Sequence, residues 1–200
     1  MNSLVVMTSA ASSDSPGRLV FLLAGQSNMA GRGPLADAPP PPPPATAATD
    51  ERITAFSQRG NGTTAPEAWS TAAEPLHADK PDKVGVGPGV AFARALLRLA
   101  PPAVVPAVGL VPCAWGGSEL ARWEEGGDLF EEAVRRTRAS LREGDALGGM
   151  LWHQGESDCG DERLAHTHAE RLVRAIQLRS AHGRPPAAAT TTSRAARRDP

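Results

Sequence analysis

The sequence predicts an α/β fold in which a parallel sheet carries helices on its faces. Three apolar runs, at residues 18–25, 104–111 and 146–152, have the length and composition of buried strands. Each run is followed by a segment with helical spacing of apolar residues, and this alternation is typical of parallel sheets. Each run also ends in a polar loop that contains glycine. Because the strands are parallel, we expect the three loops to lie at one edge of the sheet.

The helices follow from periodicity and from charge at their ends. The first is predicted at residues 90–99, with apolar side chains at positions 92, 96 and 99. The second is predicted at 129–142, where acidic residues in the first turn complement the helix dipole. Its apolar face carries Phe130, Ala133, Val134, Thr137 and Leu141. The third is predicted at about 161–179, with a stripe of Leu164, His168, Leu172 and Ile176.

The segment between the first two runs gives weaker signals. Residues 45–84 show no clear period and are predicted to be a long ordered loop region with short helices. Residues 85–89, Gly-Val-Gly-Pro-Gly, could suggest a phosphate-binding loop, but no good strand precedes them and no Lys-Ser/Thr follows. A tight entry into the next helix is therefore preferred. The consecutive prolines at 39–44 adopt polyproline II, and a surface insertion is preferred over a partner-binding adaptor motif.

The composition favours one domain and argues against several classes of function. The chain has 200 residues and a net charge of −1, so its overall charge does not indicate nucleic-acid or anionic-membrane binding. It has no apolar run long enough to span a membrane and no convincing signal peptide, so the cytoplasm is the default compartment. We expect residues 18–180 to form the domain, between a disordered leader at 1–17 and a disordered basic tail at 181–200.

The loops after the three strands contain the candidate catalytic residues. Gly25-Gln26-Ser27-Asn28-Met29 follows the first strand, and a hydroxyl at the carboxyl end of a buried strand lies where open α/β folds place their chemistry. Ser27 is therefore the candidate nucleophile. Its backbone N–H, a backbone N–H at Gly117 and the side-chain amide of Gln154 would form an oxyanion hole. The expected supporting residues are Gly25, Gln26, Asn28, Gly116, His153, Gly155 and Glu156.

Each of these residues also has an ordinary structural interpretation. A serine or a Gly-Gly pair after a strand is commonly a turn, His153 could be a packed, hydrogen-bonded histidine, and Glu156 could brace its loop. His166 and His168 lack the spacing of metal ligands, and no carboxylate cluster accompanies them. We therefore expect no metal and no cofactor.

Five blocks occur in a distinctive order: residues 22–33, 74–77, 85–89, 109–117 and 151–158. The first contains Gly-Gln-Ser-Asn-Met and the last contains Trp-His-Gln-Gly-Glu. Together they resemble plant carbohydrate esterases with a sialate O-acetylesterase-type domain, of the SGNH hydrolase superfamily. The resemblance implies a flavodoxin-like three-layer α/β/α sandwich and metal-free ester hydrolysis through Ser27. It also implies oxyanion donors at the Gly116-Gly117 turn and Gln154, and O-acetylated carbohydrates as substrates.

One part of the family pattern is absent from this sequence. The family places its base and the partnering acid in an Asp-x-x-His pair after the last strand, and the chain contains no Asp-x-x-His. The base histidine and its aspartate are therefore not found. We expect a C-terminally shortened or altered member that lacks the last strands, with the third strand as an exposed edge that invites self-association. His182 could serve as a base only if the tail folds back over the sheet.

The sequence is therefore compatible with two functions. The first is a carbohydrate O-acetylesterase that forms an acyl-enzyme through Ser27, although without a base a serine hydroxyl is a weak nucleophile. The second is a non-catalytic form of the same fold that binds glycans or a partner chain.

Overall fold

The computed structural model describes residues 17–32, 50–58 and 66–182. Its strands are β1 (Leu19–Gly25), β2 (Ile53–Phe56), β3 (Trp69–Thr71), β4 (Val108–Pro112) and β5 (Ala146–His153). Its α-helices are α1 (Gly89–Leu99), α2 (Asp128–Ser140) and α3 (Glu162–His182), with short 3₁₀ helices η2 (Pro81–Lys83) and η3 (Leu120–Trp123). The polyproline run and nearly all of the expected leader and tail lie outside the described residues.

The strands form one sheet in the order β3-β2-β4-β1-β5. β1 pairs in parallel with β4 and with β5, and β2 pairs in parallel with β4. The central strand β1 is buried on both faces, as parallel sheets covered by helices require. Phe21 and Leu23 belong to one apolar cluster, whereas Val20 and Leu22 belong to the other.

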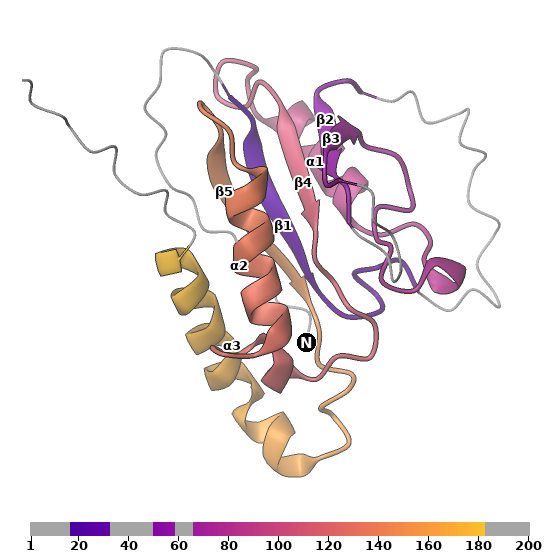
Figure 1. Ribbon diagram of the computed structural model, residues 1–200, viewed down its shortest axis with the longest axis vertical. Coiled ribbons are helices and arrows are strands. Elements are labelled where there is room, and N and C mark those ends of the chain that lie inside the picture. The colour runs from indigo at the N-terminus through magenta and orange to yellow at the C-terminus, as the bar shows by residue number, and fades with distance from the viewer. Residues whose placement is uncertain (1–16, 33–49, 59–65, 183–200) are drawn as a thin grey trace, which may run out of the picture.

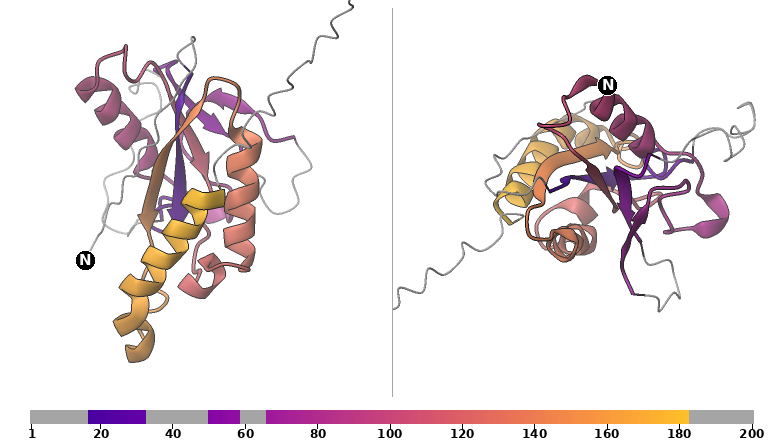
Figure 2. Two further views of the ribbon diagram at one scale, coloured as in Figure 1. Left: turned by 90° about the vertical axis from the view of Figure 1, so that its left-hand side faces the viewer. Right: turned by 90° about the horizontal axis from the view of Figure 1, so that it is seen from above.

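Helices cover both faces of the sheet and produce the predicted three layers (Figures 1 and 2). Ala93 and Leu97 of α1 pack in the cluster that contains Phe21 and Leu23. Ala133 of α2 and the partly buried Leu172 of α3 pack on the opposite face. In Figure 1 the parallel strands run toward the lower end of the molecule, so the loops that follow them gather there.

The predicted ordered loop region at 45–84 was wrong in part, because β2 and β3 lie within it. β2 has only four residues, three of them buried, so it lacks the alternation of a half-buried strand. β3 has three residues and pairs antiparallel with β2 at the outer edge, where two of its side chains are exposed. The sheet is therefore mixed, with one antiparallel edge strand added to a parallel core.

One predicted strand boundary and one predicted helix face also require correction. The second strand begins at Val108 and not at residue 104, because the amides of Val104 and Val105 both donate to the Pro101 carbonyl in a turn. Helix α1 buries Ala93 and Leu97, whereas the predicted Phe92 and Leu96 pack against the same core only partly buried and the predicted Leu99 is 85% exposed. By contrast, the predicted apolar face of α2 is confirmed from Phe130 to Thr137.

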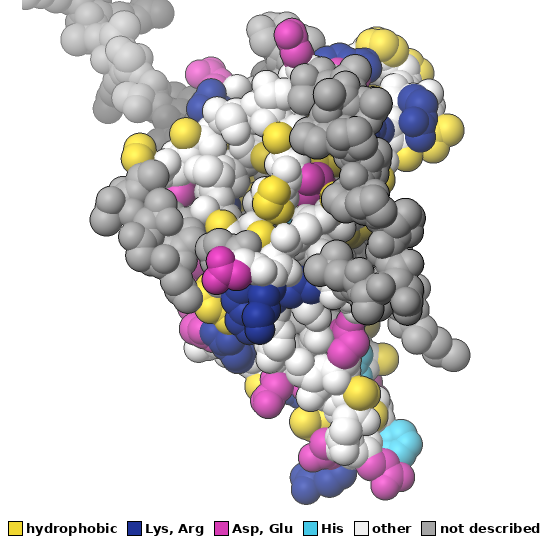
Figure 3. Space-filling view, turned by 90° about the vertical axis from the view of Figure 1, so that its right-hand side faces the viewer, with side chains coloured by type: hydrophobic (Ala, Val, Ile, Leu, Met, Phe, Trp, Pro, Cys, Tyr) yellow, Lys and Arg dark blue, Asp and Glu magenta, His cyan; other side chains and the backbone are white. Residues whose placement is uncertain are grey.

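In the described part of the chain β5 pairs with β1 on one side only, so it forms the edge predicted for the third strand. Within residues 17–32, 50–58 and 66–182, no helix is long and apolar enough to cross a membrane. Figure 3 shows acidic and basic side chains beside one another on one face, with hydrophobic side chains scattered between them. This face therefore carries no broad surface of a single charge.

Candidate active site

The loops after β1, β4 and β5 meet around Gly25, as expected for neighbouring parallel strands. The carbonyl oxygen of Gly25 accepts hydrogen bonds from the Trp115 amide at 3.0 Å and from the Ser118 hydroxyl at 3.4 Å. The amide of Gln26 donates to the carbonyl oxygen of His153 at 2.8 Å. Gly25 has φ of +129°, and a Cβ there would lie 2.1 Å from the His153 oxygen. Only glycine permits this close approach.

Ser27 lies half-buried in the turn that follows β1. Its carbonyl oxygen accepts a hydrogen bond from the Arg32 amide at 2.8 Å, and the buried side chains of Met29 and Ala30 fix the turn against the core. Among the described residues, neither the hydroxyl nor the backbone N–H of Ser27 has a hydrogen-bond partner. Both groups are therefore available to a ligand.

The Gly116-Gly117 turn after β4 forms hydrogen bonds with a loop that is distant in sequence. The Asp79 carboxylate accepts a hydrogen bond from the Gly116 amide at 2.7 Å, and the Lys80 ammonium donates to the Gly116 carbonyl at 2.9 Å. The guanidinium of Arg32 pairs with the same oxygen of Asp79 at 2.6 Å. A Cβ on Gly116 would lie 1.3 Å from that guanidinium, so glycine leaves room for this ion pair.

Gly117 has φ of +76° and is exposed. Its N–H has no acceptor in the parts of the chain that the structure describes. The left-handed conformation explains why glycine is suited to this position. The turn therefore presents an unpaired backbone donor beside the loop of Ser27.

Gln154 is half-buried, and its side-chain amide nitrogen is already engaged within the protein. The nitrogen donates to the Ser118 carbonyl oxygen at 3.1 Å and to the Asp158 carboxylate, which uses both hydrogens. Asp158 is fully buried and also accepts the Leu120 amide at 3.0 Å. A hydrogen bond from Gln154 to an oxyanion therefore requires release of one of these two bonds.

The loop after β5 contacts both the serine turn and α3. The Asn28 amide donates to Glu156 Oε1 at 2.5 Å, and the same oxygen lies 3.3 Å from His153 Nε2. The ring of His168 lies 3.7 Å from where a Cβ on Gly155 would be, so this α3 residue packs on the loop. Two imidazoles, those of His153 and His168, thus adjoin this loop.

Sequence reasoning missed the contributions of Asp79, Lys80 and Arg32. Arg32 belongs to the serine block, but Asp79 and Lys80 lie in the region without a period, and nothing local links them to Gly116. Asp158 lies in the last of the five sequence blocks, but its hydrogen-bond partners could not be predicted from the sequence. Among the described residues, no cluster of three or more His, Cys, Asp or Glu side chains could hold a metal ion.

The chain is similar to known proteins in both sequence and structure. Residues 17–187 match the family model described as carbohydrate esterase, sialic acid-specific acetylesterase. A probable carbohydrate esterase of Arabidopsis thaliana is 39% identical over 172 residues, which cover 81% of this chain and 63% of that protein. The chain thus spans less than two thirds of the length of this curated relative.

Two solved structures are similar in fold. A crystal structure of an Arabidopsis thaliana protein has a TM-score of 0.68 and 35% identity, covering 84% of this chain and 69% of that chain. A carbohydrate acetylesterase from Xanthomonas citri has a TM-score of 0.54 and 23% identity, covering 82% and 38%. The second similarity concerns the fold alone. Together with the observed layers, these structures confirm the predicted fold class.

Proposed function

Because the chain belongs to the carbohydrate esterases of the sialic acid-specific acetylesterase family, we propose that it hydrolyses O-acetyl esters on carbohydrates with Ser27 as the nucleophile. The observation that carries the proposal is the meeting of three strand-end loops at Gly25. Ser27 lies there with an unbonded hydroxyl in the part of the chain that the structure describes. The carboxyl edge of a parallel sheet is also where this type of fold places its ligands.

The proposed reaction proceeds through an acyl-enzyme. Ser27 Oγ attacks the acetyl carbonyl carbon and loses its proton to a base, while the carbonyl oxygen becomes an oxyanion. The tetrahedral intermediate collapses and the sugar leaves as an alcohol, taking the proton that the base accepted from Ser27. Water, deprotonated by the same base, then attacks the acetyl-serine, and the second tetrahedral intermediate releases acetate as Ser27 regains its proton.

The oxyanion would be stabilised mainly by backbone donors. The N–H groups of Ser27 and Gly117 support this role, because neither is used within the described residues. Gln154 would supply a third donor after exchanging its bond to Ser118 or Asp158. Loss of one such donor typically lowers kcat by about 10²–10³.

The proposed reaction needs a general base near Ser27. The chain contains no Asp-x-x-His, to which the family resemblance assigns the base. His153, with Glu156 at 3.3 Å, and His168, packed against Gly155, are the imidazoles that adjoin the loop after β5. Both are therefore tested as sources of the general base.

The test compares the purified chain with Ser27→Ala, using p-nitrophenyl acetate and acetate release from an O-acetylated polysaccharide. Ser70→Ala is the matched control, because Ser70 is an exposed serine in β3 at the far edge of the sheet. We expect turnover in the wild type and in Ser70→Ala, and only background rates in folded Ser27→Ala. His153→Ala and His168→Ala then identify the base.

Equal background rates for folded wild type and folded Ser27→Ala would overturn the catalytic proposal. The alternative, a glycan- or partner-binding form of the fold, would then be favoured. It predicts retention of acetylated polysaccharide by the wild type and by Ser27→Ala alike.

A further inference from the structure

We propose that Lys80 is a positioning residue that orients the N–H of Gly117 toward the oxyanion. This inference rests on the proposed function, because it assigns a task within the same site. Lys80 belongs to no predicted motif and lies 36 residues from Gly116 in the sequence, yet its ammonium donates to the Gly116 carbonyl at 2.9 Å.

The planar peptide bond couples the Gly116 carbonyl to the Gly117 N–H. The carbonyl of Gly116 and the N–H of Gly117 belong to one peptide group, and in a trans peptide they point in opposite directions. A hydrogen bond that holds the Gly116 carbonyl therefore also fixes the direction of the Gly117 N–H. Consistent with this arrangement, a Cβ on Gly117 would lie 4.0 Å from Lys80 Nζ.

This constraint matters because the turn is otherwise soft. Two successive glycines have wide conformational freedom, and a peptide between them can rotate at little cost. The preceding amide, Gly116 N–H, is anchored by the fully buried Asp79 carboxylate at 2.7 Å. Lys80 follows Asp79 directly, so two successive residues hold the N–H and the carbonyl of Gly116 and leave one orientation for the next amide.

A cation on the carbonyl also strengthens the donor. Hydrogen bonds in a chain polarise one another, so an ammonium bound to the Gly116 oxygen makes the Gly117 N–H a better donor. The described residues offer Lys80 no carboxylate partner that would compete for its ammonium. Its exposed side chain also means that substitution should leave the fold intact.

The experiment measures kcat and KM for p-nitrophenyl acetate with Lys80→Met, Lys80→Arg and Lys83→Met. Met replaces the aliphatic stem of lysine without its ammonium donor, and Arg retains a donor. Lys83 is an exposed lysine whose side chain has no hydrogen bond or ion pair within the described part of the chain. We expect Lys80→Met to lower kcat about tenfold with KM within about threefold of wild type. Lys80→Arg should recover most of the loss, and Lys83→Met should match wild type.

Three kinetic results would overturn the proposal: an unchanged kcat in Lys80→Met, an equal loss in Lys83→Met, or a raised KM at constant kcat. The last would mean that Lys80 binds substrate. A second readout does not need turnover. In NMR spectra, Lys80→Met should shift the Gly116 carbonyl ¹³C and Gly117 amide resonances, whereas Lys83→Met should not. If the wild type lacks Ser27-dependent turnover, the proposed function fails, and these resonances alone decide whether Lys80 holds the peptide.

Discussion

Asn28 donates its side-chain amide to Glu156 Oε1 at 2.5 Å, which ties the residue after Ser27 to the loop after β5. The same oxygen lies 3.3 Å from His153 Nε2. The Glu156 carboxylate thus links the serine turn with the imidazole of His153. In the pairing of β1 with β5, His153 lies opposite Gly25. This hydrogen bond is exposed, so its loss should change the geometry of the site more than the free energy of unfolding.

Replacing Glu156 by alanine should therefore lower ester turnover without unfolding the protein. We expect kcat/KM to fall about tenfold because Asn28 and His153 lose their common partner. The free energy of unfolding should change by less than about 1 kcal/mol, since exposed pairs contribute little. Glu156→Gln, which keeps an acceptor oxygen, should lose less. Kinetics and urea unfolding of both variants check this, and an unchanged kcat/KM in Glu156→Ala would contradict it.

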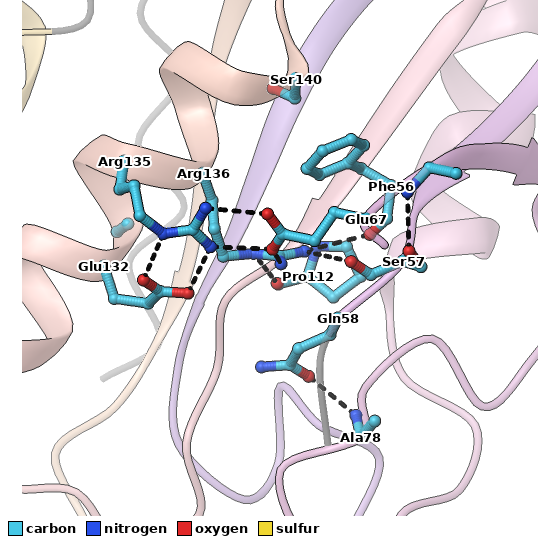
Figure 4. A network of polar contacts seen from close by, with 12 residues as sticks. Phe56, Ser57, Gln58, Glu67, Ala78, Pro112, Glu132, Arg135, Arg136 and Ser140 are labelled. Carbon is cyan, nitrogen blue, oxygen red and sulfur yellow. Dashed lines mark hydrogen bonds and ion pairs between the residues drawn. The ribbon is translucent and has the colours of Figure 1, made fainter. Parts of the chain in front are cut away.

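We expect stability to depend on a different polar network, centred on Arg136 in α2 (Figure 4). Arg136 is 1% exposed and donates to the carbonyl oxygens of Pro112, Phe56 and Ser57, at the carboxyl ends of β4 and β2. It also pairs with Glu67. One guanidinium thus satisfies carbonyl groups that the ends of two strands leave unpaired.

Arg136→Met should lower the free energy of unfolding by about 3 kcal/mol, because it leaves Glu67 partly uncompensated and three carbonyls without their donor. Arg135→Met is the matched control. Arg135 also pairs with Glu67, at 2.8 Å, but its side chain is 47% exposed. We expect the control to cost less than about 1 kcal/mol. Equal losses in the two variants by urea unfolding would show that burial does not set the contribution of these arginines.

The sequence predicts the central architecture because its signals there are local. β1, β5 and α2 are long enough for burial and periodicity to be visible, and their ends carry glycine or polar residues. The meeting of the loops at Gly25 also follows, since parallel strands place their carboxyl ends together. The short strands β2 and β3 could not be predicted from the sequence. They have four and three residues, and they are strands because they pair with neighbours in the sheet.

The candidate site also contains residues that the sequence reveals and residues that only tertiary contacts reveal. Ser27 and the glycine turn were recognisable as strand-end loops, although their catalytic roles stay predictions. The hydrogen bonds of Asp79 and Lys80 to Gly116 depend on a tertiary contact across 37 and 36 residues. The engaged amide of Gln154 depends on the buried Asp158, and only the folded structure brings its partners together.

The buried His77 should make stability fall in mild acid. Burial, the largest cause, lowers the pKa of its imidazole from 6.5 to about 4. The hydrogen bond with the Leu23 backbone and the charge of Asp79 oppose this shift, and the charges of Arg136 and Arg32 add to it. Its Nε2 is buried without a partner among the described residues, so the bond to Leu23 comes from Nδ1.

The free energy of unfolding depends on pH because the folded and unfolded chains protonate His77 at different pH values. Between pH 6.5 and about 4, the unfolded chain protonates this histidine and the folded protein does not. The free energy of unfolding should therefore fall as the pH falls through this window, by about 3 kcal/mol in total, and be independent of His77 above it. Glu74 acts in the opposite sense, because burial raises the pKa of its carboxyl.

His77→Asn isolates this contribution, because asparagine can place a donor near the Nδ1 position but does not titrate. The variant should be less stable than wild type at pH 7.5, where it has lost packing, and the difference should shrink as the pH approaches 4. Urea unfolding at several pH values between 7.5 and 4 measures both curves. If the two stability curves run parallel, the folded protein takes up the proton on His77 as readily as the unfolded chain does. Burial would then not lower the pKa of this imidazole.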